Sequence, residues 1–300
     1  MTSPVIFDRR QVLTNRLRAA ADLSKNSFLF DWAMKNLVDR LGLVRRRFPR
    51  ALQIGARSSP EHTNTLAEIA DSEQVIVMDH EAVVARYKGW RVAADEESLP
   101  FAPQTFDLAV SPLSLHTVND LPGALIQIRR CLKPDGLFLA ALPGGRTLHE
   151  LRECLMQAEL EISGGVSPRV APFADKQQMG SLMQRAGFAL PVVDSEIVTV
   201  TYQDIHGLMA DLRGMGESNA VAARSRAVTG KKLWREAGRL YSEKFAESDG
   251  RLAATFEFIF LIGWAPHESQ QKPLRPGSAQ KSLADALGTK EIGTGEKATP

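Results

Sequence analysis

Short continuous runs of apolar residues recur along the first half of the chain and predict buried strands. The stretches between these runs have helical spacing; Phe30 and Met34, for example, share one face of a helix. The predicted strands are 51–54, 75–78, 92–94, 106–110 and 137–142, and the predicted helices are 7–21, 26–43, 61–70 and 121–132. Because strands alternate with helices, we expect right-handed crossovers and a parallel sheet.

The second half of the chain has a different pattern. Two helices, a long strand rich in Val and Thr, two or three further helices and a last strand are predicted, in order, over 148–162, 176–186, 192–202, 204–247 and 255–264. From Pro266 onward Pro, Gly, Ser, Lys and Gln dominate, so we expect the tail 266–300 to be largely disordered. The expected organisation is a helical extension 1–47, a main domain 48–265 with a helical lid at about 203–250, and this tail.

Composition excludes some classes of partner. The formal net charge of +2 over 300 residues argues against a nucleic-acid binder driven by bulk charge. A local basic cluster is formed by Arg45, Arg46, Arg47 and Arg50. We interpret it as a solvated helix end and loop, with a phosphate or acidic-partner patch as the alternative.

Further features bear on the compartment. Cys131 and Cys154 lack paired spacing for zinc or a redox couple, which fits a reduced, cytoplasmic setting. No apolar run approaches the roughly 20 residues of a membrane helix. The basic segment 7–21 also holds Asp8, whereas transit peptides are poor in acids, so we interpret it as a helix of the mature protein. Peripheral docking on the inner face of a membrane is the alternative for that helix.

Three residues at successive strand ends could build a ligand pocket. In doubly wound sheets, ligands bind outside the carboxyl ends of the strands. Gly55 lets the backbone approach a ligand, Asp79 can accept from ribose hydroxyls, and Asp95 can accept from an exocyclic amine. Each has a plain alternative: a turn glycine, a helix N-cap or a solvated loop acid.

The order of these residues, with the flanking segments, resembles the class I S-adenosylmethionine-dependent methyltransferase superfamily, type 11 branch. The resemblance rests on Gly55, Asp79 and the segments 94–101, 106–111 and 125–136. It implies a seven-stranded Rossmann-like fold with an N-terminal helical extension and a helical insertion between strands 6 and 7. It also implies S-adenosyl-L-methionine as cofactor, held by Gln53, Gly55, Arg57, Asp79, Asp95 and Ser111.

A second resemblance covers nearly the whole chain. It rests on segments 7–9, 114–122, 144–152, 164–173, 209–219 and 267–270, of which Gly-Met-Gly-Glu-Ser-Asn at 214–219 is the most specific. These segments look like the family of respiratory complex I assembly factor 5 and its bacterial relatives. The resemblance implies modification of a protein, by hydroxylation of an arginine, with a peripheral-arm subunit of complex I as partner.

The chain departs from the methyltransferase pattern around its first glycine. The superfamily has an acid at the position of Gln53 and glycines at those of Arg57 and Ser59. Arg57 places a long cation near the sulfonium and ammonium of the donor. We therefore expect weakened or altered cofactor binding, which micromolar binding of S-adenosylmethionine would contradict. If Arg57 fills the cavity expected beside Gly55, Asp79 and Asp95, a methyl donor is disfavoured.

The candidate catalytic residues are His116, Glu217 and Asn219. His116 follows the fourth predicted strand, where it faces the pocket mouth in this fold, although it could equally satisfy packing. Glu217 and Asn219 lie in 214–219, which forms either a lid over the pocket or a helix end followed by a new helix capped by Ser218 or Asn219. No metal site is predicted, although hydroxylation usually needs a redox-active group.

Three functions remain open at this point. The first is an arginine-hydroxylase-like factor in complex I assembly. The second is a conventional O- or N-methyltransferase acting on a small molecule or on a carrier-protein-bound carboxylate. The third is a non-catalytic assembly chaperone. Fold alone does not choose among them.

Overall fold

The computed structural model describes residues 5–271 and 287–290, so most of the tail predicted to be disordered lies outside the described residues. Contacts divide the chain into two units, Met1–Pro266 and His267–Pro300. All helices and strands named below belong to the first unit. No helix in the described part of the chain combines the length and apolar character needed to cross a bilayer.

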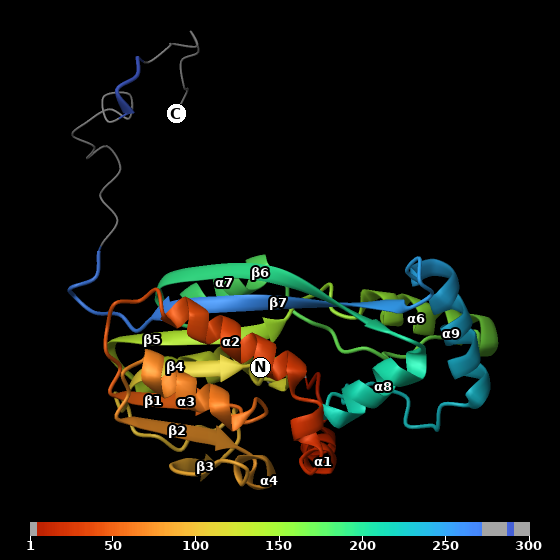
Figure 1. Cartoon of the computed structure of the whole chain (residues 1–300), viewed down its shortest axis with the longest axis horizontal. Helices are drawn as coiled ribbons and strands as arrows, with labels where there is room; N and C mark the ends of the chain where they lie inside the picture. The colour runs from red at the N-terminus through yellow and green to blue at the C-terminus, as the bar shows by residue number, and fades with distance from the viewer. Residues whose placement is uncertain (1–4, 272–286, 291–300) are drawn as a thin grey trace. The chain divides into compact units, whose positions relative to one another are not determined.

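A seven-stranded sheet forms the centre of the first unit, in the order β3-β2-β1-β4-β5-β7-β6 (Figure 1). The strands are β1 Arg50–Ile54, β2 Gln74–Asp79, β3 Arg91–Ala93, β4 Phe106–Pro112, β5 Leu132–Pro143, β6 Ala189–Tyr202 and β7 Leu252–Trp264. Their order and the flanking helices confirm the predicted Rossmann-like fold.

One strand outside the first half of the chain makes the sheet mixed. β1 to β5 pair in parallel, as predicted, but β7 runs antiparallel to both of its neighbours, β5 and β6. The last residue of β6, Tyr202, pairs with the first residue of β7, Leu252. The insertion therefore leaves β6 and enters β7 at the same end of the sheet, so β7 runs antiparallel to β6.

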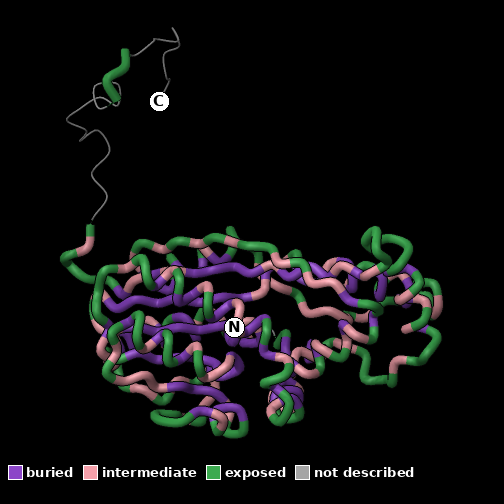
Figure 2. Tube along the Cα trace, viewed as in Figure 1, coloured by how far each residue is buried: buried purple, intermediate pink, exposed green. Residues whose placement is uncertain are grey.

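Helices cover both faces of the sheet, and the side chains of each strand alternate between the two layers. In β5, Leu139 faces the layer that contains α2, whereas Phe138 faces the layer that contains α5 and α7. Figure 2 shows the central strands as the most deeply buried part of the unit. The helices are α1 Arg9–Ala19, α2 Phe28–Leu41, α3 Pro60–Ile69, α4 Glu81–Val84, α5 Leu121–Cys131, α6 His149–Ser163, α7 Lys176–Arg185, α8 Ile205–Gly214 and α9 Lys231–Phe245, with short 3-10 helices at Leu23–Lys25 and Leu115–Thr117.

The helical extension and the insertion meet each other although they are far apart in sequence. α8 and α9 lie in the insertion between β6 and β7, as predicted. Phe7, just before α1, forms an antiparallel bridge with Val221, which follows α8. Asp8 then caps α1 by accepting from the backbone N–H of Gln11. The start of α1 and the loop after α8 are thus fixed together at the carboxyl ends of the strands.

Candidate functional site

The turn after β1 needs a glycine and is tied to β2. Gly55 has a φ of +97°, and a Cβ there would lie 2.8 Å from Cβ of Ser114. The next residue, Ala56, donates its N–H to Oδ2 of Asp79 at 2.8 Å. Gln53, which stands where the superfamily has an acid, donates to the carbonyl of Gly55 and accepts from the hydroxyl of Thr63. Its amide group is therefore occupied by the turn itself.

The two predicted nucleoside acids already have partners within the chain. Asp79 is buried, and its second oxygen accepts from the N–H of His80 at 2.7 Å. Asp95 accepts from Nη2 of Arg9 at 2.6 Å and from the N–H of Glu97 at 2.8 Å. The structure therefore places both acids at neighbouring strand ends, where both oxygens of Asp79 and Oδ1 of Asp95 accept from protein donors.

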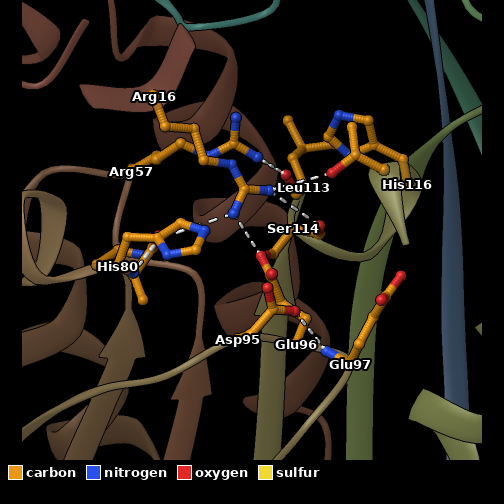
Figure 3. Close-up of polar contacts among 12 residues, drawn as sticks. Arg16, Arg57, His80, Asp95, Glu96, Glu97, Leu113, Ser114 and His116 are labelled. Carbon is orange, nitrogen blue, oxygen red and sulfur yellow. Dashed lines mark hydrogen bonds and ion pairs between the residues drawn. The ribbon is translucent and has the colours of Figure 1, made fainter. Parts of the chain in front are cut away.

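A buried ion pair between Arg16 of α1 and Glu96 lies beside these acids (Figure 3). Their side chains are 1% and 3% exposed, and Nη1 of Arg16 lies 2.6 Å from Oε1 of Glu96 and 3.8 Å from Oδ1 of Asp79. Glu96 also accepts from Arg9 at 2.9 Å and from the hydroxyl of Ser114 at 2.5 Å. Burial alone would raise the pKa of Glu96, but the charges of Arg16 and Arg9 outweigh it and hold that pKa far below its usual range.

Arg57 crosses from the end of β1 to the end of β4. Its buried guanidinium donates to the carbonyl of Leu113 and to the carboxylate of Glu217, and it lies 4.3 Å from the ring centroid of Phe30. Burial lowers its pKa. Figure 3 shows Arg57 and Arg16 pointing into the same space at the strand ends.

Glu217 joins Arg57 to His116. Its Oε2 lies 3.0 Å from Nε2 of His116, while its Oε1 accepts from Arg57. Burial would raise the pKa of Glu217, but His116 and Arg57 together hold it well below its usual range. Two of the predicted catalytic residues, from segments remote in sequence, are therefore in direct contact.

Beyond Glu217 lies a cavity of about 420 Å³. Its walls are largely apolar and aromatic, and include Phe7, Phe30, Phe173, Trp234, Phe256 and Phe258. The three predicted catalytic residues, His116, Glu217 and Asn219, line it. The six predicted cofactor residues do not line it. Gly55, Asp79 and Asp95, which we expected to line one cavity, are therefore not part of this one.

Two predicted site residues have other surroundings. Asn219 donates to the carbonyl of Pro168 and accepts from the N–H of Val221, so it braces the loop at the cavity wall. Ser111 is fully buried in β4, and its hydroxyl has no hydrogen-bond partner in the described part of the chain.

The segment 214–219 ends a helix, as the pattern indicated, because α8 stops at Gly214. The alternative that Ser218 or Asn219 caps a new helix is wrong. The chain continues as a loop to α9, whose N-cap is Gly230. The backbone around Val221 is used in the bridge to Phe7 rather than in a helical turn.

Sequence reasoning missed Arg9, Arg16 and Glu96. In the sequence, Arg9 and Arg16 are simply part of the basic segment 7–21, and Glu96 is part of the segment 94–101. The spacing of seven between the two arginines places them on one face of α1, which was the available signal. Nothing local in the sequence indicates which acids they meet.

One described group could offer ligands to a metal ion. Ligand atoms of His80, Asp95 and Glu96 lie within 4.8 Å of one another. Nη2 of Arg9, however, lies 2.6 Å from Asp95 and 2.9 Å from Glu96, between the two carboxylates. As arranged here, these three residues do not fit a metal ion, because a guanidinium holds that position.

Comparisons with known proteins now identify the family. The methyltransferase domain family matches residues 52–140. Arginine-hydroxylase NDUFAF5, mitochondrial, of Danio rerio is 39% identical over 288 residues, which cover 93% of this chain and 89% of the relative. The chain belongs to the NDUFAF5 family of the methyltransferase superfamily. This assignment places the chain in the S-adenosylmethionine-dependent methyltransferase superfamily and supports the interpretation that the protein is an enzyme.

More distant relatives share the fold of the NDUFAF5 family. Malonyl-[acyl-carrier protein] O-methyltransferase of Laribacter hongkongensis is 31% identical, covering 92% of this chain and 96% of the relative. The crystal structure of BH2331 from Bacillus halodurans C-125, described as a methyltransferase, has a TM-score of 0.54 at 14% identity. It covers 78% of this chain and 99% of that one, and it shows the fold alone.

The residues at the strand ends do not fit a methyl donor as they are arranged here. The resemblance to the superfamily implies that Asp79 and Asp95 hold the nucleoside, but both acids accept hydrogen bonds from groups of the chain. Arg16 and Arg57 point into the space between the ends of β1, β2 and β4. Both arginines therefore add positive charge where the resemblance places a donor that carries a sulfonium and an ammonium.

Proposed function

We propose that this protein modifies an arginine side chain of a peripheral-arm subunit during assembly of respiratory complex I. The support is the family, whose members are named arginine-hydroxylases, together with the whole-chain resemblance to a complex I assembly factor. The proposed partner follows from that resemblance. The proposed cytoplasmic place of action rests on the unpaired cysteines, and the inner face of the membrane on the basic segment 7–21.

The observation that carries the proposal is the chemistry of the cavity. Glu257 lines it, accepts from the N–H of Arg146 at 2.9 Å, and has no ion-pair partner among the described residues. A carboxylate within aromatic walls suits a guanidinium, which forms charge-assisted hydrogen bonds and packs on aromatic faces. Phe30, which already packs against Arg57, also lines the cavity.

Residues of this chain would bind and orient the arginine. Glu257 would pair with the guanidinium, while Glu217 and His116 form the polar end of the cavity. Inserting one oxygen atom from dioxygen into a carbon–hydrogen bond takes two electrons from an external reductant and two protons, and releases the second oxygen as water. A redox-active group would supply that chemistry. The described residues support binding and orientation, and binding of S-adenosylmethionine is proposed to be weak.

The test uses the host organism. We would delete the gene, restore it as wild type or as Glu257→Gln, and measure the mass of the arginine-bearing subunit together with complex I activity. The proposal expects an oxygen atom to be missing after deletion, returned by the wild type and not by E257Q. Normal modification with failed assembly would indicate a chaperone instead.

A second candidate is methylation of a carboxylate on a carrier protein. It is favoured by the 31% identity to a malonyl-carrier methyltransferase and by Arg18, which lines the cavity and could meet an acidic substrate. Arg169 and Arg224 also line the cavity but are paired with Glu159 and Asp8. Intact complex I together with loss of a methylated metabolite in the deletion strain would select it.

A further inference from the structure

We propose that α1 is a latch over the nucleoside acids: its arginines and a nucleoside compete for the same carboxylates, so one excludes the other. The inference concerns this donor side, defined by Gly55, Asp79, Asp95 and Glu96. It stands whether or not the cavity receives an arginine.

The competition follows from which atoms are occupied. Arg9 takes Oδ1 of Asp95 and Oε2 of Glu96, while Arg16 takes Oε1 of Glu96 and lies 3.8 Å from Asp79. Both arginines also reach Thr117, at its carbonyl or hydroxyl oxygen. A nucleoside amine or hydroxyl needs carboxylate acceptors at the same strand ends. Oδ1 of Asp95 and both oxygens of Glu96 are thus occupied by guanidinium groups, so a nucleoside that uses these oxygens must displace an arginine.

The latch opens as a unit rather than one side chain at a time. Arg16 and Glu96 are almost fully buried, so withdrawing one alone leaves the other charge buried without a partner. Moving α1 as a whole avoids this, because water then reaches both charges. An intermediate with only one charge withdrawn is strongly disfavoured, and we expect the latch to be either closed or open.

Opening of the latch also reaches the cavity. The backbone N–H of Asp8 donates to the carbonyl of Ala220, and the side-chain amide of Asn15 donates to the carbonyl of Ser218. These bonds tie α1 to the loop that carries Glu217. Lifting α1 therefore pulls on Glu217 and on its contacts with Arg57 and His116. Binding at the donor side and binding in the cavity are thus coupled, and the coupling is reciprocal.

The first test removes the latch and measures affinity for S-adenosylhomocysteine by calorimetry. The unlatched variant is R9M/R16M/E96Q, which removes the buried pair together and keeps Asp79 and Asp95. Its matched control is R10M, which removes an exposed arginine of the same helix that does not line the cavity. We expect at least tenfold tighter binding by the unlatched variant, loss of the gain when Asp79→Asn is added, and a control within twofold of wild type.

Two results would overturn the proposal in this test. One is equal affinity of the wild type and the unlatched variant. The other is a gain in affinity that survives D79N, because the nucleoside would then bind elsewhere.

The second test uses the unaltered protein and keeps the proposal testable if the variant fails to fold. Amide hydrogen exchange in α1 is measured with and without saturating S-adenosylhomocysteine. A latch predicts faster exchange over residues 12–19 in the bound state, since α1 must leave its position. Unchanged or slower exchange with ligand bound would show that α1 stays in place, and would overturn the proposal.

Discussion

The donor side and the cavity side lie on either side of the Arg57–Glu217 contact, and they differ in whether their charged groups are paired within the chain. On the donor side, Glu96, Arg16 and Asp79 are buried, and every one of them is paired within the chain. On the cavity side, the structure leaves about 420 Å³ of space and a carboxylate, that of Glu257, with no ion-pair partner among the described residues. The superfamily fold is thus retained, while the described cavity lies away from the donor acids; a fold alone does not fix the chemistry that it carries.

The largest expected effect comes from cutting the buried pair on the donor side. Arg16→Ala leaves Glu96 buried without its main cation and should cost about 3–5 kcal/mol of unfolding free energy. Arg18→Ala, on the same helix but exposed, should change it by less than about 0.5 kcal/mol. Denaturant unfolding of both variants measures the difference. Similar losses of unfolding free energy in the two variants would mean that the buried ion pair contributes no more to stability than an exposed arginine of the same helix.

The next effect concerns the glycine turn on the donor side. Gly55→Ala forces a Cβ into a positive-φ position 2.8 Å from Ser114, and should cost about 1–3 kcal/mol. Gly145→Ala is the control, because no neighbouring atom lies within 4 Å of its added Cβ and its φ is not positive. Thermal unfolding of the two variants compares them, and an undisturbed G55A would show that the turn relaxes freely.

The dependence of the unfolding free energy on pH should reveal the buried carboxylate of the donor side. The pKa of Glu96 is lowered in the folded state, so below about pH 4.5 the unfolded state binds a proton that the folded state does not. The stability that Glu96 provides is therefore present above that pH and is lost as the pH falls. Glu96→Gln should reduce the slope of unfolding free energy against pH by up to about 1.4 kcal/mol per pH unit. Denaturant titrations between pH 5 and pH 3 measure it, and an unchanged slope would contradict the assignment.

The smallest expected effect on stability is on the cavity side. Glu257→Gln keeps an oxygen that can accept from the N–H of Arg146, so unfolding free energy should change by about 0.5 kcal/mol or less. Binding of an arginine-containing peptide should nevertheless weaken at least tenfold, because the charge is lost. Fluorescence titration with the peptide tests this. A large loss of stability without a loss of binding would reverse the contrast between the sides.

The sequence predicted what depends on local pattern. The strand ends at Gly55 and Asp79 follow from short apolar runs, and the insertion before β7 follows from the change of pattern after 202. The pattern does not predict the antiparallel direction of β7, because hydrophobic periodicity carries no information about the direction of a strand relative to its neighbours. The pairing of Arg16 with Glu96 could not be predicted from the sequence either, since the partner of a charged residue depends on packing between remote segments.

The bridge between Phe7 and Val221 has an evolutionary consequence. It makes the amino-terminal extension and the loop after α8 one piece of the molecule, although they are separated by most of the chain. A substitution in either segment is then constrained by the other. Across related sequences, the two segments should change together, and they should be gained or lost as a pair.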